Sequence, residues 1–375
     1  MQVRLFPSGR VHSAYLDMVK YPPKGIEYVG DFSYAVGTSV DFFGKGTAAY
    51  AADMLGLPYV FPVKSNHLVH SCQKLLSTEA NYVIDIEHGN PFMGAANIHK
   101  HNYPHFRWIT KYLLNKSNCK MLMPWTNIAK EAFELNFSFL GKDFMNDKLT
   151  VVYPATYPFY GKITRFIDFT FIFVAGRSFF AKGGVATLEA FKKLIINVPD
   201  AKLLVVGATP DHIKMRYADV EGVTFYSHID RDILMGIIAK CHCLLLPSMG
   251  DTFGMIIIEA KAREVPAIIV DSFSAKEIVE HNVTGMLVDP DKNVIPWFDD
   301  KGRKRLNKTV FHEQFEKYTP SHEHVMKLFN TMYKMARSKN SAILMGENAK
   351  REVDVGRFSI EERNRKLKEI YEAAE

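Results

Sequence analysis

The stretch FTFIFVAGRSFFAKGGVATLEAFKKLIINVPDAKLLVVG, residues 169–207, decides the fold class. Its two ends are runs of Val, Ile, Leu and Phe of strand length, and a helical pattern lies between them. Within that pattern Val185, Leu188, Phe191 and Leu194 recur at helical spacing and indicate a buried face. A strand, a helix and a second strand in this order predict a parallel sheet covered by helices.

The alternation continues as far as residue 290. Helical patterns and strand-length apolar runs follow one another in the segments 231–240, 241–248, 255–263, 266–271 and 285–289. The first 150 residues show the same style less clearly, with strand patterns such as YVIDIEH at 82–88. We therefore expect α/β architecture along the whole chain.

A chain of 375 residues is long for one hydrophobic core, so two domains are expected. Two prolines in TVVYPATYP indicate a linker, and the predicted domains are residues 1–157 and 158–350. Residues 351–375 are expected to end in an amphipathic helix that returns to the N-terminal domain, with Ser359 and Glu362 as a capping box. Residues 291–318, which include the basic run KGRKRLNK, are interpreted as a surface insertion.

Composition excludes several classes of protein. No apolar run approaches the roughly eighteen residues of a membrane-spanning helix, and the N-terminus lacks a secretory pattern, so a cytoplasmic location is expected. The net charge of +6 suits an anionic ligand or peripheral contact with the anionic inner face of a membrane. Neither a concentrated basic face nor a known module indicates a nucleic-acid partner.

The cysteine and histidine clusters do not indicate a metal. The four cysteines form no disulfide framework. In CHCLLLPS, Cys241 and Cys243 flank His242, but no second ligand pair of zinc spacing exists, and a buried strand explains the run better. The segment with His99, His101 and His105 is interpreted as polar surface, so no metal site is predicted.

The segment GRSFFAKGG, residues 176–184, follows one predicted strand and opens a helix. Ligands bind beyond the carboxyl ends of strands in open α/β sheets, and a helix N-terminus favours an anion. Gly176 permits close approach, and Arg177 and Lys182 add two cations that suit a diphosphate. The alternative is that both cations are solvated loop residues. Because no G-x-G-x-x-G triplet follows a predicted strand, an NAD-dependent oxidoreductase is disfavoured.

The segment LLLPSMGDTFGMIIIEAKAREVP, residues 244–266, holds a second constellation. Ser248, Asp251 and Gly254 lie in a loop after a predicted strand, and Glu259 follows Asp251 in a D-x7-E pattern inside a helix. Two acids placed in this way could hold a polyol at both ends. The alternatives are an ion pair of Glu259 with Arg263 and a capping or turn role for Asp251.

These segments, taken in order, resemble the signature of family 4 glycosyltransferases, the glycosyl transferases group 1, which have the GT-B fold. AGRSFFAKGGVATLEAF resembles the family's Gly-Arg…Lys-Gly segment, and the D-x7-E pair resembles its E-x7-E motif. EIVEHNVTGMLVDP resembles the segment that closes the domain. The resemblance covers about half of the chain and implies two facing Rossmann-like domains, with the acceptor on the N-terminal side and the nucleotide-sugar donor on the second.

The resemblance also implies roles for individual residues. Arg177 and Lys182 would bind the donor diphosphate, Glu259 the ribose hydroxyls, and Asp251 the transferred sugar. The base would lie near Tyr226 and His228. The remaining donor-binding positions implied are Gly176, Ser248, Phe253, Gly254 and Met255, the last three through backbone N–H groups.

A histidine in the N-terminal half completes the expected set. His88 follows a predicted strand, and the resemblance implies that it contacts the donor sugar. With Arg177, Lys182 and Asp251 it makes up the expected catalytic residues. His70 stands at a similar strand end and is interpreted as structural.

The chain departs from the family pattern at four points. The family's N-terminal Gly-Gly loop is not evident, and FPSGRVHSAY, residues 6–15, is expected in its place. Asp251 replaces the first acid, which is usually Glu. Glu264 stands where a glycine usually precedes Val-Pro, and DSFSAK, residues 271–276, replaces a Gly-rich turn. These departures bear on the identity of the sugar more than on the class of enzyme.

The expected function is therefore a retaining hexosyltransferase that uses a UDP-sugar or GDP-sugar and requires no cofactor. The acceptor is expected to be a hydroxyl of a glycan, lipid-linked or cell-envelope molecule. The alternatives left open are a GT-B nucleotide-sugar epimerase or phosphorylase and a non-catalytic sugar-nucleotide binding module.

Overall fold

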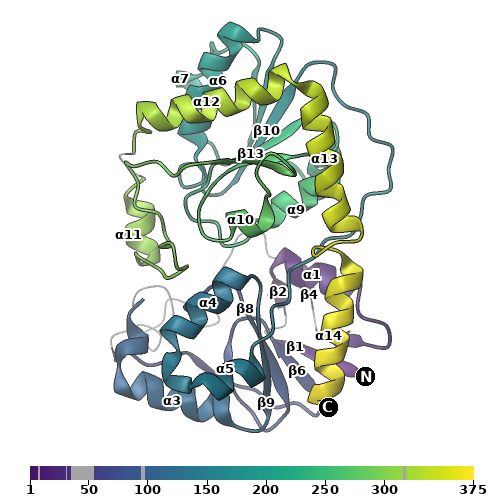
Figure 1. Cartoon of the computed structure of the whole chain (residues 1–375), viewed down its shortest axis with the longest axis vertical. Coiled ribbons are helices and arrows are strands. Elements are labelled where there is room, and N and C mark those ends of the chain that lie inside the picture. Colours follow the sequence, from purple (N-terminus) through teal and green to yellow (C-terminus); the bar gives the residue numbers. More distant parts are fainter. Residues whose placement is uncertain (7–8, 31, 35–54, 94–97, 316–317) are drawn as a thin grey trace. The chain divides into compact units, whose positions relative to one another are not determined.

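The computed structural model describes residues 1–6, 9–30, 32–34, 55–93, 98–315 and 318–375. The chain forms two compact units. Unit 1 comprises Met1–Ala155, Phe298–Thr309 and Ile360–Glu375, and unit 2 comprises Thr156–Trp297 and Val310–Ser359. Each unit contains a parallel sheet with helices packed on it, as Figure 1 shows, which confirms the predicted α/β fold class.

Unit 1 is built on a five-stranded parallel sheet of order β3-β1-β6-β8-β9. Its strands are β1 (Gln2–Phe6), β3 (Glu27–Val29), β6 (Leu68–Ser71), β8 (Tyr82–Ile86) and β9 (Cys119–Pro124). Two short parallel pairs join β2 (Gly9–Val11) with β4 (Phe32–Tyr34) and β5 (Val60–Pro62) with β7 (Leu75–Ser77). The helices are α1 (Ser13–Lys20), α3 (Pro104–Asn115), α4 (Asn127–Asn136), α5 (Lys142–Lys148) and α14 (Ile360–Ala374), with short 3-10 turns η1 (Lys100–Asn102) and η2 (Ser138–Leu140).

The C-terminal helix α14 packs into unit 1. Its apolar stripe buries Leu367, Ile370 and Tyr371. The Tyr371 hydroxyl lies 2.5 Å from His70 Nδ1, and His70 Nε2 lies 2.9 Å from Asp85 Oδ2, so His70 is a buried structural residue. A histidine satisfied on both nitrogens holds the last turns of α14 against β6 and β8.

Unit 2 is built on a six-stranded parallel sheet of order β12-β11-β10-β13-β14-β15. Its strands are β10 (Thr170–Gly176), β11 (Lys202–Gly207), β12 (Val223–Tyr226), β13 (Cys243–Leu246), β14 (Ala267–Val270) and β15 (Gly285–Val288). Its helices are α6 (Gly184–Asn197), α7 (Asp211–Arg216), α8 (Arg231–Ile238), α9 (Met255–Lys261), α10 (Ala275–Ile278), most of α11 (Lys308–Glu313), α12 (His322–Arg337) and α13 (Lys339–Asp354).

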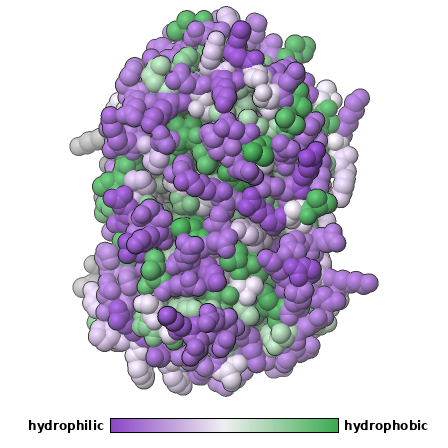
Figure 2. Space-filling model, in the orientation of Figure 1, coloured by the Kyte–Doolittle hydropathy of each residue, from purple (hydrophilic) through white to green (hydrophobic). Residues whose placement is uncertain are grey.

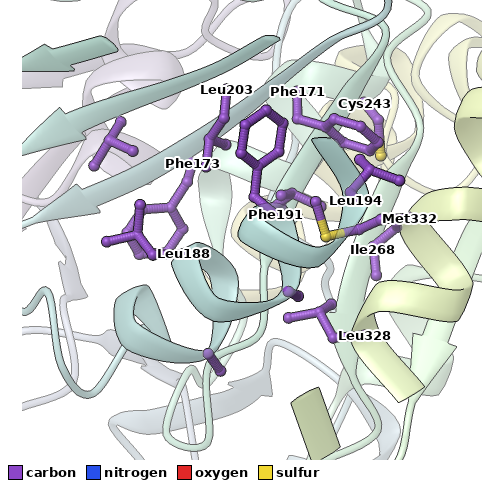
Figure 3. Close-up of a cluster of buried hydrophobic side chains, with 14 of the residues drawn as sticks. Phe171, Phe173, Leu188, Phe191, Leu194, Leu203, Cys243, Ile268, Leu328 and Met332 are labelled. Atoms are coloured by element: carbon purple, nitrogen blue, oxygen red, sulfur yellow. The ribbon is translucent and has the colours of Figure 1, made fainter. Parts of the chain in front are cut away.

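The core of unit 2 lies where α6 and α12 cover the middle of the sheet. Phe171 and Phe173 on β10 meet Leu188, Phe191 and Leu194 on α6, and all five are buried. Figure 3 shows these side chains with Leu328 and Met332 of α12. The helical stripe expected from the sequence is therefore core and fixes the position of α6 on the sheet.

The predicted second domain differs from unit 2 in two segments. Residues 298–309 belong to unit 1, because Phe298 is buried and the Lys304 N–H donates to Asn90 Oδ1 over 3.3 Å. The basic run is thus not wholly a surface insertion. Residues 351–359 belong to unit 2, and only the helix after them joins unit 1.

The surface carries mostly hydrophilic residues on the face shown in Figure 2, with hydrophobic residues in small groups among them. None of the helices in the described ranges combines the length and the apolar character needed to cross a bilayer.

Glu264 has a left-handed backbone, with φ of 58°. This conformation is unfavourable for residues that carry a Cβ and is open to glycine. The family that the chain resembles usually has a glycine at this position, and the left-handed backbone explains that preference. Phe273, within the replaced Gly-rich turn, is also left-handed at φ of 46°.

We expect Glu264→Gly to raise the free energy of unfolding by about 1 kcal/mol, because it relieves a left-handed backbone. Equilibrium urea unfolding followed by circular dichroism measures the change. Asn282→Gly is the matched control: φ is 64° there as well, but asparagine tolerates the conformation, so its gain should be smaller. An equal gain in the two variants would contradict the explanation.

Candidate functional site

The candidate site lies where the strand order of unit 2 reverses. From β10 the chain proceeds outward to β11 and β12, and then returns to β13 on the other side of β10. Such a reversal opens a crevice beyond the carboxyl ends of the two strands. The loops after β10 (residues 177–183) and after β13 (residues 247–254) leave the sheet at this position.

The two loops pack directly on one another. Gly183 has φ of 84°, and a Cβ there would lie 2.4 Å from the carbonyl oxygen of Pro247. The Ser248 hydroxyl donates to the Ala181 carbonyl over 3.3 Å. Gly183 is therefore required both for its backbone conformation and for the close approach of the second loop.

An ion pair joins the same loops. The Lys182 ammonium contacts Asp251 Oδ1, and both side chains are about three-quarters buried. Asp251 Oδ2 is buried and has no hydrogen-bond partner among the described residues. A buried carboxylate oxygen without a donor is unfavourable, so this atom is ready to accept a hydrogen bond from a ligand.

Asp251 does not cap the following helix. Gly254 is the N-cap of α9, with φ of 71° and no side-chain cap hydrogen bond. The alternative of a capping role is therefore wrong, and the carboxylate is directed to Lys182 instead.

The N-terminus of α6 lies beside the ion pair. Gly183 is its N-cap and provides no side chain to accept from the first-turn N–H groups. The positive end of a helix of this length favours an anion at that position. Arg177 is exposed directly after β10, and Gly176 has φ of 55°, so the turn that leads to Arg177 uses glycine's conformational freedom.

Glu259 is buried in α9 and pairs with a residue that the sequence analysis did not identify. Its carboxylate contacts the Arg231 guanidinium at the start of α8. Arg263 instead donates from Nη1 to the Glu259 carbonyl over 2.8 Å, so the alternative of a Glu259–Arg263 ion pair is wrong. An arginine in the first turn of a helix opposes the helix dipole, and this was the available signal that Arg231 has an acidic partner.

The far end of α9 is also fixed. The Lys261 ammonium is fully buried and pairs with Glu352 of α13, and burial lowers its pKa to about 8. The pair ties the end of α9 to α13, two residues after the Glu259–Arg231 pair ties the same helix to α8.

The other expected donor-binding residues divide by location. Ser248 and Phe253 in the loop after β13 and Met255 at the start of α9 are buried, so Phe253 and Met255 can contribute only backbone groups. Tyr226 and His228 are exposed at the end of the edge strand β12, separated from β10 by β11.

His88 follows β8 in unit 1 and is held as a neutral imidazole. Its Nδ1 accepts from the Asn90 N–H over 3.1 Å, so its proton lies on Nε2. Burial, with Lys304 nearby, holds the pKa of His88 well below its usual range. Burial also lowers the pKa of Lys304 to about 8, and no sequence signal had connected this lysine with His88.

The clusters considered for a metal are accounted for otherwise. Cys241 and Cys243 are free and buried, and His242 Nδ1 accepts from the Thr170 N–H over 3.1 Å. Burial lowers the pKa of His242 to about 4. Across the described ranges, no group of three or more His, Cys, Asp or Glu residues could hold a metal ion.

We expect Arg231→Ala to lower the free energy of unfolding by roughly 1–3 kcal/mol, because it leaves the Glu259 carboxylate buried without a cation. The expected loss of stability is smaller than for a fully buried ion pair, because the Arg231 side chain is 35% exposed. Urea unfolding measures the change, and adding Glu259→Gln should recover most of it.

Arg216→Ala is the matched control. Arg216 pairs with Glu189 at 2.6 Å, but its side chain is 60% exposed, so this change should alter stability by less than about 0.5 kcal/mol. An Arg231→Ala variant as stable as Arg216→Ala would contradict a buried role for the Arg231–Glu259 pair.

Known proteins share this sequence pattern and this fold. Residues 162–318 match the family described as glycosyl transferases group 1. A glycosyltransferase of Methanocaldococcus jannaschii is 25% identical over 181 residues, which are 45% of this chain and 46% of that protein. The chain spans less than half the length of each curated relative it matches.

The whole chain is similar to solved structures at low identity. The Anabaena protein HepE, solved in complex with UDP and glucose, is 14% identical, with a TM-score of 0.60 over 99% of both chains. Sucrose-phosphate synthase of Thermosynechococcus elongatus is 14% identical, with a TM-score of 0.58 over 99% of this chain and 98% of that one. The chain therefore has the GT-B fold, and its residues 162–318 are similar to the family of glycosyl transferases group 1.

Proposed function

We propose that this protein is a retaining glycosyltransferase that moves a hexosyl unit from a nucleotide-diphosphate sugar to a hydroxyl of a glycan or lipid-linked acceptor. The observation that carries the proposal is the Lys182–Asp251 pair at the strand-order reversal. It places a cation at the N-terminus of α6 and a carboxylate with one oxygen unsatisfied beside it. The UDP and glucose in the HepE complex support a UDP-sugar as the donor.

Donor binding would exchange the ion pair for contacts with the ligand. The diphosphate takes the place of Asp251 as the partner of Lys182, with Arg177 and the N-terminus of α6 adding positive potential. The released Asp251 accepts from hydroxyls of the transferred sugar. Glu259, held by Arg231, accepts from the ribose hydroxyls, and the base lies near Tyr226 and His228.

Transfer would then follow front-face attack. The acceptor hydroxyl oxygen bonds to the anomeric carbon on the face from which the diphosphate leaves, while the bond from that carbon to the phosphate oxygen breaks. The hydroxyl proton passes to the leaving phosphate oxygen. The protein contributes positioning and stabilises the charge that develops on the diphosphate. His88, neutral and protonated on Nε2, is proposed to donate to the donor sugar.

We expect Lys182→Ala to lower kcat/KM for transfer by about 10²–10³-fold, because a cation that stabilises the leaving group is lost. Saturation-transfer NMR with UDP-, GDP- and ADP-sugars first identifies the donor, and nucleotide release with an acceptor then measures the rate. Lys192→Ala, an exposed change on the same helix α6, should retain the wild-type rate.

Two outcomes would overturn parts of the proposal. Proton NMR of freshly formed product reads the anomeric configuration, and inversion would exclude the retaining mechanism. Turnover of the nucleotide sugar without any acceptor would favour an epimerase or phosphorylase, and binding without turnover would favour a non-catalytic module.

A further inference from the structure

Helix α3 (Pro104–Asn115) of unit 1 presents large aromatic side chains to solvent. Phe106, Thr110, Leu113 and Leu114 are buried on its inner face. On the outer face Trp108 is 71% exposed and Tyr112, one turn later, is 57% exposed. Their rings stack at 13° with centroids 6.1 Å apart, so they form one flat apolar surface.

The same helix lies in a segment without acidic residues. No Asp or Glu occurs between Glu87 and Glu131. Lys111 is exposed next to Tyr112 in the chain, and the Lys116 ammonium lies 5.2 Å from the centre of the Tyr112 ring. Arg107 instead donates from Nε to the His101 carbonyl over 2.6 Å and lies over the Phe139 ring. The outer face of α3 therefore combines stacked aromatic rings with positive charge.

Charge complementarity selects the partner for this face. Trp and Tyr rings, each apolar with one polar group, suit the boundary between lipid headgroups and acyl chains. Lysine and arginine can lay their apolar stems along that boundary while their charged ends reach anionic headgroups. A polyanion that binds through charge alone would contact the cations of this face but would gain little free energy from the stacked rings.

We propose that the outer face of α3, formed by Trp108, Lys111 and Tyr112 with the adjoining Lys116, docks on a bilayer that contains anionic phospholipids. The argument for membrane binding uses only the residues of this surface and does not depend on the proposed function. Its consequence rests on the proposed function: a bilayer surface would give the enzyme access to a lipid-linked acceptor.

Flotation of the full chain with vesicles tests the proposal. The chain is expected to float with phosphatidylcholine vesicles that contain phosphatidylglycerol, less so at high salt, and not with phosphatidylcholine alone. Lys111→Glu should weaken the partition by roughly tenfold or more, because it replaces an attractive charge by a repulsive one. Trp108→Ala should weaken it through loss of apolar contact.

Tryptophan fluorescence provides a local readout. The chain has three Trp, and Trp125 is buried. Anionic vesicles should therefore shift wild-type emission to the blue, and Trp108→Phe should abolish that shift while retaining flotation.

Two changes elsewhere are matched controls. Lys24 is exposed before β3, at the sheet edge opposite β9, which α3 contacts, so Lys24→Glu is an equal charge reversal away from the face. Tyr160→Ala removes an aromatic side chain of unit 2 that is 88% exposed. Both controls should keep most of the partition.

The proposal fails if wild type does not float with anionic vesicles, or if Lys24→Glu weakens flotation as much as Lys111→Glu. It also fails if heparin or duplex DNA binds this face while vesicles do not.

UDP binding, measured by calorimetry on the same variants, should be unchanged. A wild type that binds neither UDP nor GDP would count against the proposed function and leave the docking result unchanged.

Discussion

The ion pair of Lys182 with Asp251 is the interaction on which the candidate site depends. It joins loops that leave the sheet from neighbouring strands but belong to segments nearly seventy positions apart, with |i−j| of 69. The pair can form because β13 lies next to β10 and because Gly183 lets the second loop approach. A ligand that separates the two charges therefore contacts both halves of the unit's fold at once.

Both acids of the D-x7-E pattern are neutralised in the protein alone. Asp251 pairs with Lys182, and Glu259 pairs with Arg231. Leaving one buried carboxylate, Glu259, and one mostly buried carboxylate, Asp251, without cations would be strongly unfavourable. Under the proposed function, ligand binding would exchange the partners of Lys182 and Asp251, because the diphosphate and the sugar hydroxyls would replace their mutual contact, while Glu259 would keep Arg231.

Much of the fold could be predicted from the sequence, because strands of a covered parallel sheet are continuous apolar runs and α6 carries a regular stripe. The position of the site followed from glycine, cation and acid placement at strand ends. The identity of the ionic partners could not be predicted, because Arg231 and Asp251 meet their partners only through the strand order. Lys304 was missed for the same reason: its segment joins unit 1 although it is surrounded in sequence by unit 2.

Two of the departures from the family pattern place residues with a Cβ in backbone conformations that favour glycine. Glu264 and Phe273 adopt left-handed conformations that favour glycine, yet the turns persist. The surrounding contacts explain this at Glu264, whose carbonyl accepts from Arg165 Nη2 over 2.6 Å. A tertiary contact therefore helps to maintain at Glu264 a turn that the local sequence opposes.

Hydrogen–deuterium exchange of the whole chain, with and without UDP or GDP, tests the central claim most directly. If the diphosphate binds between the loops after β10 and β13, one of the two nucleotides should slow exchange mainly in residues 176–186 and 248–260. Saturating nucleotide that slows exchange only in unit 1, or that leaves both of these segments unchanged, would contradict the account.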